Sequence, residues 1–225
     1  MAGAVAAATD WLVAPAPAAP EPMRARTRDR PVVAVVGLGP RSGTTTVARA
    51  LGTELAVRDG EGACAVTAAM GSVLCLGTPA ARRLARAVAS AGHNARTCGR
   101  LCLIDVPDRV SLAGTASGLA PLVFDEGDPR AAAVVATLAD RVVLVGGPQV
   151  EPALAGVVAA SLARVGPRPL VVASRPPEGS GWTGRVDMAI PHSRLGAQCA
   201  LAGHGPAGHF GRAVEALADL MERWE

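Results

Sequence analysis

The sequence predicts a doubly wound α/β fold, that is, a mostly parallel sheet with helices on both of its faces. From Pro31 onward, short apolar and β-branched segments alternate with longer segments of helical pattern. Most of the short segments are hydrophobic along their whole length, which is typical of parallel strands covered on both faces. In such a fold, ligands bind at the carboxyl ends of the strands.

The chain divides into a tail and one domain. Residues 1–30 are rich in Ala, Pro and Arg and have no apolar period, so we expect a disordered tail there. Residues 31–225 are expected to form a single α/β domain. With 225 residues, of which 50% are hydrophobic, the chain is long enough for one full core.

The expected elements follow from runs of apolar residues and from helix-start signals. Strands are expected at Val32–Val36, Ala63–Thr67, Leu101–Asp105, Arg141–Val145, Pro169–Ala173 and Val186–Ile190, with a further short strand at Pro121–Phe124. Helices are expected at Thr45–Val57, Pro79–Ala91, Pro129–Ala139, Pro152–Val165 and Phe210–Arg223. Three of these helices begin with proline, which suits the first helical position.

Residues 32–50, VVAVVGLGPRSGTTTVARA, have the layout of a phosphate-binding loop without its lysine. A strand, a Gly-rich turn and a helix N-terminus direct backbone N–H groups at one point. When Gly43 is set on the second glycine of G-x-x-x-x-G-K-[ST], Thr44 stands at the lysine and Thr45 at the hydroxyl that binds magnesium. The chain contains no lysine anywhere. The absence of lysine from the loop therefore reflects either drift of the whole sequence or a loss of function at this site.

Three further segments follow in a recognisable order: LCLIDVPD (101–108), RVVLVGGPQVEPALAGVVAASL (141–162) and DMAIPHSRLGAQCALAGHGPAGHFGRAVEALADLM (187–221). Together with the loop, this order over residues 32–222 resembles the MinD/ParA family of P-loop ATPases. The resemblance implies ATP or ADP with magnesium as the cofactor, and a protein partner or a homodimer. The resemblance implies an atypical, lysine-less member, similar to the septum-site and pilus-assembly branches.

The resemblance also implies a set of site residues. The family loop K-G-G-x-G-K-T-T overlays Gly39 to Thr46, so that Gly39 and Thr44 stand at its two lysines. Asp105 matches the acid that closes the Walker B strand, Ser174 the base-contacting asparagine, and Pro191 the residue that lines the adenine. The expected nucleotide-binding residues are Gly39, Arg41, Ser42, Gly43, Thr44, Thr45, Thr46, Asp105, Ser174 and Pro191, with Thr45 and Asp105 as magnesium ligands.

Three residues have a second interpretation. Arg41 either turns back onto the phosphates, which its planar guanidinium suits, or points into solvent. Asp105 either orients magnesium through water or caps the turn that follows it. Trp182 either stacks on the nucleobase or packs its loop onto the domain.

Hydrolysis is expected to be slow. Phosphoryl transfer depends on placed charges, and a single cation can be worth about 10³–10⁵ in rate; both lysine positions are empty here. No Asp or Glu lies between Glu61 and Asp105, where the family's switch carboxylate is expected. We therefore assign no catalytic residue and interpret the chain as a pseudo-ATPase, a regulatory or positioning factor. The alternatives are a nucleotide-free interaction scaffold and an active ATP-dependent synthetase or amidotransferase.

Composition limits the other classes of function. No apolar run reaches the roughly 18 residues of a membrane span, and the last helix has an acidic polar face that anionic lipid repels. We therefore expect no membrane partner and read this helix as a core or subunit-contact helix. The net charge of +3 gives no indication of nucleic acid. Five scattered cysteines and no basic leader lead us to expect reduced thiols in the cytoplasm.

Overall fold

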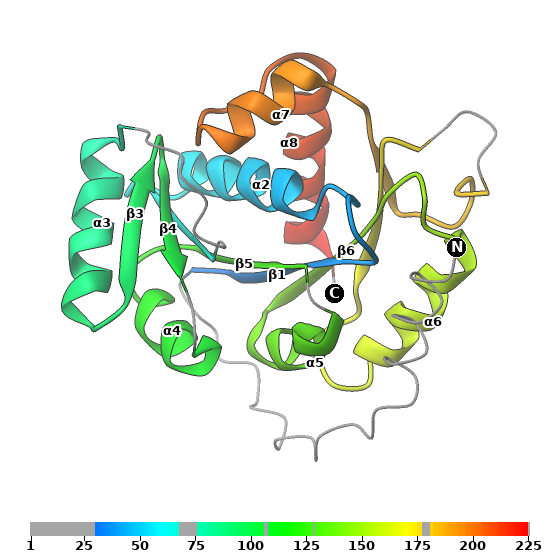
Figure 1. The fold of residues 1–225 in the computed structure, drawn as a ribbon, viewed down its shortest axis with the longest axis horizontal. Coiled ribbons are helices and arrows are strands. Elements are labelled where there is room, and N and C mark those ends of the chain that lie inside the picture. The colour runs from blue at the N-terminus through cyan, green and yellow to red at the C-terminus, as the bar shows by residue number, and fades with distance from the viewer. Residues whose placement is uncertain (1–29, 68–75, 106–107, 128, 177–180, 225) are drawn as a thin grey trace.

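The structure is a computed structural model that describes residues 30–67, 76–105, 108–127, 129–176 and 181–224, which form a central sheet between two layers of helices (Figure 1). The strands are β1 (Val32–Gly37), β2 (Cys64–Thr67), β3 (Asn94–Cys98), β4 (Leu101–Asp105), β5 (Leu122–Glu126), β6 (Arg141–Gly146), β7 (Leu170–Ser174) and β8 (Met188–Ile190). Their order in the sheet is β3-β4-β2-β5-β1-β6-β7-β8.

Neighbouring strands in the described sheet are parallel, except for the antiparallel pair β3–β4 at one edge. β1 lies near the centre, where it pairs with β5 on one side and with β6 on the other. Every residue of β1 is buried, as expected for a strand that helices cover on both faces. The predicted α/β fold with a mostly parallel sheet is therefore confirmed.

Helices cover the two faces of the sheet. The helices are α2 (Thr44–Arg58), α3 (Pro79–Ser90), α4 (Arg109–Ala116), α5 (Pro129–Leu138), α6 (Pro152–Leu162), α7 (Arg194–Leu201) and α8 (Gly208–Arg223). Alternate residues of β1 point to opposite faces: Val33 and Val35 share a core with α2, α7 and α8, whereas Val32 and Ala34 share one with α3, α4, α5 and α6. Two separate cores therefore lie on either side of one sheet.

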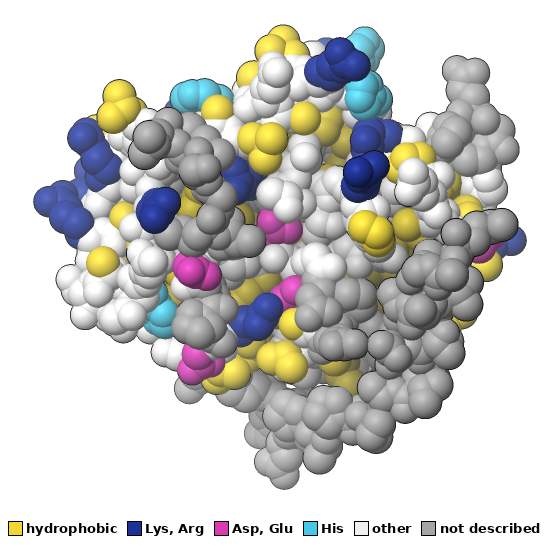
Figure 2. Space-filling view, viewed as in Figure 1, with side chains coloured by type: hydrophobic (Ala, Val, Ile, Leu, Met, Phe, Trp, Pro, Cys, Tyr) yellow, Lys and Arg dark blue, Asp and Glu magenta, His cyan; other side chains and the backbone are white. Residues whose placement is uncertain are grey.

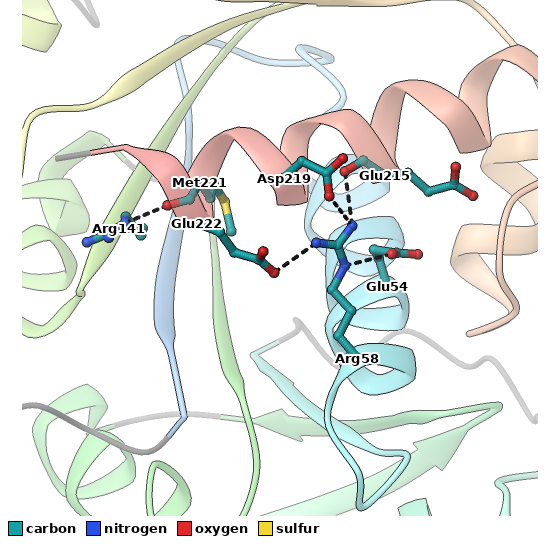
Figure 3. Close-up of polar contacts among 7 residues, drawn as sticks. All are labelled: Glu54, Arg58, Arg141, Glu215, Asp219, Met221 and Glu222. Carbon is teal, nitrogen blue, oxygen red and sulfur yellow. Dashed lines mark hydrogen bonds and ion pairs between the residues drawn. The ribbon is translucent and has the colours of Figure 1, made fainter.

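The helix that follows the loop, α2, lies close against the sheet. A Cβ added to Gly52 would lie 2.8 Å from a Val66 methyl group, so this glycine sets how near α2 approaches β2. At its far end, Arg58 donates hydrogen bonds to Glu54 and, across to α8, to Asp219 and Glu222 (Figure 3). Burial alone would lower the pKa of Arg58, but these hydrogen bonds raise it above its ordinary value.

The C-terminal helix α8 belongs to the core. Its apolar stripe, Phe210, Val214, Leu217 and Met221, is buried against the sheet, while the acidic side chains Asp219 and Glu222 bind Arg58 of α2. Within the described residues, no helix is both long enough and apolar enough to cross a membrane.

Two glycines bring distant segments into backbone contact. Gly99, in the turn between β3 and β4, faces Gly203, which follows α7, and a Cβ on either residue would overlap the backbone of the other segment. Arg100 N–H donates to the Gly203 carbonyl at 2.9 Å. Both glycines have positive φ, 55° and 65°, a conformation that glycine adopts at little cost. The β3–β4 edge is therefore fastened to the α7–α8 corner.

Three elements were not expected from the sequence. β3 reads NARTC and has no apolar run, because only one of its faces is covered. α4 and α7 are short and contain glycine, so their helical pattern is weak; each begins at a side-chain cap, Asp108 and Ser193 respectively. The short strand expected at Pro121–Phe124 exists as β5, and it is the strand that lies beside β1.

Arg30 marks the start of the described domain. We assigned it to the tail, but its Nε donates to Asp59 at 3.0 Å and its Nη1 to the Leu119 carbonyl at 2.6 Å. Residues 1–29 lie outside the described residues, so the disordered tail stays a prediction.

One edge of the molecule is basic. Figure 2 shows dark blue side chains gathered over α3, where Arg82, Arg83 and Arg86 are exposed. No Asp or Glu occurs between Glu61 and Asp105, so this stretch of sequence contains no carboxylate to balance these arginines.

Candidate functional site

The loop between β1 and α2 ends in an open helix N-terminus. The first helical bond runs from Val47 N–H to the Gly43 carbonyl at 2.9 Å, so the N–H groups of Gly43 to Thr46 have no acceptor within the helix. The N-cap residue is Gly43, which has no side chain to accept from these donors, and the first turn contains no acidic residue. Together with the helix dipole, these donors form a site suited to a phosphate group.

The backbone of the loop requires glycine at position 43. Gly43 has φ of 87°, in the left-handed region that side chains disfavour. A Cβ at this position would also lie 2.7 Å from the Ser174 hydroxyl at the end of β7. On the other side, a Cβ on Gly147 would lie 2.7 Å from Ser42 Cα. The loop is thus packed closely between the ends of β6 and β7.

Two arginines with strained backbones flank the loop. Arg41 and Arg175 have φ of 60° and 55°, and they are the described non-glycine residues with positive φ. The Arg175 guanidinium donates to the Arg41 carbonyl, so β7 supports the loop directly. The Arg41 side chain is exposed, and both interpretations of this residue stay open.

The residue at the lysine position, Thr44, faces inward. It is 7% exposed, and its hydroxyl lies 2.8 Å from the Ser42 hydroxyl. A Cβ added to Gly37 would overlap this hydroxyl, so Thr44 is enclosed beneath the loop. Its side chain therefore supplies neither a charge nor an outward donor to a ligand.

Thr45 is paired with a carboxylate that the sequence did not lead us to choose. Its hydroxyl donates a hydrogen bond to the Asp125 side chain, which stands at the carboxyl end of β5, in register with Val35 of β1. The Thr67 hydroxyl accepts the Asp125 N–H at 2.8 Å, which fixes the end of β5 against β2. Asp125 is therefore the carboxylate that lies at the loop.

Asp105, which we expected at this position, lies elsewhere. It ends β4, and β2 and β5 separate β4 from β1. Its side chain is exposed and its backbone pairs with Asn94 of β3. The segment LCLID has the pattern of a Walker B strand, but a local pattern does not determine the order of strands in a sheet. In the structure the segment VFDE, which belongs to β5, lies next to β1.

The charge environment of Asp125 is unusual. Burial raises the pKa of its carboxyl to about 6, although the Thr45 hydrogen bond and the positive charge of Arg49 act in the opposite direction. Arg49 lies on α2 one turn after Thr45 and is 6% exposed. The neighbouring Glu126, which raises the pKa of Asp125 slightly, is itself held by Arg109 of α4 at 2.7 Å.

The residues present do not fit a magnesium ion well. Thr45 and Asp125 supply oxygen donors of the kind that magnesium prefers, and P-loop NTPases hold it in this way. However, the positive charge of the buried Arg49 also acts on the Asp125 carboxylate. Within the described residues, no cluster of three or more His, Cys, Asp or Glu side chains could hold a metal.

The remaining predicted residues lie at the same edge of the sheet. Ser174 is buried beside Gly43, and Pro191 follows Ile190, the β8 partner of Ser174. Gly39 has Val150 as its nearest neighbour, 3.7 Å from an added Cβ, so it has room for a side chain. Trp182 packs on Gly146 and is 3% exposed. This agrees with the second interpretation of Trp182, in which it packs its loop onto the domain.

The buried cysteines are not part of the site. Burial raises the pKa of Cys102 to about 12 and that of Cys64 well above its ordinary value. Thiols with a raised pKa are poor nucleophiles and poor metal ligands.

The fold and the loop define a P-loop-like α/β protein, and solved structures share this fold. A ParA family ATPase from Chlorobium tepidum TLS superposes with a TM-score of 0.57 at 13% identity, covering 84% of this chain and 97% of that chain. MinD of Aquifex aeolicus does so with a TM-score of 0.56 at 16% identity, covering 87% and 98%. The MinC:MinD complex of Aquifex aeolicus gives a TM-score of 0.56 at 16% identity, covering 87% and 97%.

These likenesses show the fold alone, because the sequence identities are low. Neither a protein-family model nor a curated protein sequence matches the chain. The MinD/ParA-like fold expected from the loop and the order of segments is nevertheless confirmed.

Proposed function

We propose that this chain is a nucleotide-binding protein of the MinD/ParA type that hydrolyses its nucleotide slowly and acts as a regulatory or positioning factor. One observation carries the proposal: the open N–H groups at the start of α2 lie beside the Thr45–Asp125 pair, while a buried threonine fills the lysine position. The donors for a phosphate are present, and the cation that accelerates its transfer is not.

In this proposal the phosphates of ATP or ADP lie on the N–H groups of Gly43 to Thr46. The base lies toward Ser174 and Pro191, at the ends of the neighbouring strands β7 and β8. Arg41, exposed in the loop, is the available cation on the solvent side. The partner is a second copy of the chain or another protein, and the compartment is the cytoplasm.

Binding and hydrolysis are affected differently by the missing lysine. One charge-assisted hydrogen bond contributes about 1.5–3 kcal/mol, so its loss weakens nucleotide binding by roughly ten- to a hundredfold. Hydrolysis loses more, because a cation on the transferring phosphoryl group can be worth about 10³–10⁵ in rate. A protein of this kind would bind a nucleotide and release it largely unhydrolysed.

Isothermal titration with ADP and with ATP tests the proposal. Gly43→Ala should weaken binding by about tenfold or more, because the new Cβ meets the Ser174 hydroxyl and opposes the positive φ. Gly156→Ala on α6 is the matched control, since a Cβ there has open space. Circular dichroism and thermal unfolding establish that both variants fold.

Two results would replace the proposal. If the folded wild-type protein binds neither ADP nor ATP, the chain is an interaction scaffold without nucleotide. If phosphate release reaches about 1 s⁻¹ or more, a rate typical of working enzymes, the chain is an active ATP-dependent enzyme.

A further inference from the structure

The arginines around α3 and β3 form a surface, here called the basic edge, whose charge nothing nearby balances. It consists of Arg82, Arg83 and Arg86 of α3, Arg96 of β3 and Arg100 of the turn that follows β3. All five side chains are exposed (Figure 2). Among the described residues, none of them takes part in an ion pair, and the sequence from 62 to 104 contains no carboxylate. The basic edge is therefore a row of cations without counter-charges.

The arginines of α3 stand where a helix disfavours them. The helix buries Ala81, Leu84 and Val88, and Arg82 and Arg86 lie four residues apart on its other side, a spacing at which like charges repel. No acidic residue occurs in the first turn and no basic residue in the last, so the charges oppose the helix dipole. An anionic partner would offset both effects.

The basic edge is short, and carboxylates bound it at both ends. At one end, a Cβ added to Gly62 would lie 3.7 Å from Arg100 Nη1 and 3.9 Å from the Cβ of Ala80, so Glu61 lies close to this end. At the other end, the exposed Asp105 pairs with Asn94 of β3. The lengths of α3 and β3 are roughly 16–18 Å. The two carboxylates would repel a long polyanion that extends beyond the arginines.

Apolar surface and strand backbone lie beside the arginines. Leu76 is 95% exposed and precedes Gly77, which pairs with Gly99 after β3. β3 is the edge strand of the sheet, and edge strands can pair with an extended segment of another protein. No aromatic residue occurs between Trp11 and Phe124, so this stretch offers no ring on which a single-stranded base could stack. These features suit a polypeptide better than a nucleic acid.

We propose that the basic edge binds a short acidic segment of a partner protein, which lies along α3 and β3. Its carboxylates pair with the guanidinium groups, whose planar forks match a carboxylate in two parallel hydrogen bonds. A second copy of the chain is a poorer partner, because Asp219 and Glu222 of its acidic helix α8 are already bound by Arg58. Three strands separate β3 from β1, so this inference does not depend on nucleotide binding.

Fluorescence anisotropy of the full, nucleotide-free chain tests the inference. The probe is a fluorescein-labelled peptide in which glutamate alternates with valine. The wild-type protein should bind it with an affinity that falls as salt is added. Arg82→Glu/Arg86→Glu should weaken binding by about tenfold or more. Its thermal midpoint should not fall, because glutamate suits the N-terminal half of a helix better than arginine does.

The matched control is Arg185→Glu/Arg194→Glu, which changes the net charge by the same amount. Both arginines are exposed, and Arg194 is the first residue of α7. This variant should bind the peptide within about twofold of the wild type. The same peptide with lysine in place of glutamate should not bind the wild-type protein.

Four results would overturn the inference. The wild type fails to bind the acidic peptide, or the two double variants lose affinity equally, which would mean that only the total charge matters. A short DNA duplex or phosphatidylserine vesicles bind more tightly than the peptide, and the α3 variant loses this binding. Sedimentation shows a wild-type dimer that the α3 variant does not form, so that the occupant is a second copy.

The test stays decisive in two further cases. If Arg82→Glu/Arg86→Glu does not fold, Arg82→Gln/Arg86→Gln takes its place, with Arg185→Gln/Arg194→Gln as the control. Failure of the protein to bind ADP or ATP overturns the proposed function and leaves the peptide measurement to decide on the basic edge.

Discussion

The Thr45 hydroxyl donates a hydrogen bond to the Asp125 carboxylate, which joins the first turn of α2 to the end of the strand beside β1. This contact brings together residues that are eighty positions apart in the sequence. The register of β5 beside β1, in which Asp125 pairs with Val35, places this carboxylate at the loop independently of any motif. The first prediction follows from the same carboxylate.

Asp125 should make the stability of the protein fall as the pH rises from about 4 to 6. Its pKa is raised from 3.8 to about 6 in the folded state, so in this window the folded protein holds a proton that the unfolded chain has released. The loss is at most about 3 kcal/mol and persists above the folded pKa. The measurement is urea unfolding of the wild-type protein and of Asp125→Asn, whose difference in unfolding free energy should change across this window. A difference that stays constant from pH 4 to 7 would contradict the raised pKa.

Arg58→Met should lower the free energy of unfolding by about 1 kcal/mol, because the substitution removes three ion pairs near the surface and such pairs contribute little each. Two of these pairs connect α2 to α8 through Asp219 and Glu222, and the effect should shrink in 1 M salt, where the Debye length is about 3 Å. The control is Arg83→Met on α3, an exposed arginine. Equal stability of the two variants at low salt would mean that the pairs contribute nothing.

Thr44→Lys should strengthen nucleotide binding by about 1.5–3 kcal/mol, because it places a cation where the backbone donors converge. Thr44→Val is the matched control: it keeps the shape, removes the hydroxyl that contacts Ser42, and adds no charge. Isothermal titration with ATP measures the gain, and a phosphate-release assay should still record slow hydrolysis.

An unchanged affinity in folded Thr44→Lys would mean that the enclosed position beneath the loop does not let the lysine reach the phosphates. Fast hydrolysis in this variant would mean that Asp125, or another carboxylate outside residues 62–104, activates water.

Removing residues 1–29 should leave the thermal midpoint nearly unchanged, because these residues lack an apolar period. Removing one more residue should lower it, since Arg30 contacts Asp59 and the Leu119 carbonyl. Differential scanning calorimetry of chains that begin at position 30 and at position 31 makes the comparison. A large drop already in the longer chain would show that the tail packs on the domain.

The fold class and the place of the loop could be predicted from the sequence because both depend on local pattern. Val32–Val36 is uniformly apolar, Gly43 precedes a helical segment, and the alternation of strand and helix restricts the topology. The carboxylate could not be assigned in the same way. The strands that end in Asp105 and in Asp125 look alike, and only the crossover connections decide which one lies beside β1.

Arg49 was missed for a different reason. α2 is buried on most of its sides, against the sheet, α7 and α8, so its sequence shows little amphipathic contrast. An arginine in such a helix gives no sign of which way it points. Its partner, the Leu201 carbonyl, is 152 positions away, in a short helix that was itself not expected.

The contact between Gly99 and Gly203 has a consequence for how the chain is made. Synthesis proceeds from the N-terminus, so the strands around the loop, β1, β2 and β5, leave the ribosome before α7 does. Until Gly203 arrives, the turn between β3 and β4 lacks the backbone acceptor for Arg100 N–H, so this hairpin is attached to the rest of the domain only when the end of α7 has been made. The backbone contact that fastens this early hairpin is thus supplied by one of the last segments to be synthesised, and a nascent chain that stalls before Gly203 holds the hairpin without that contact.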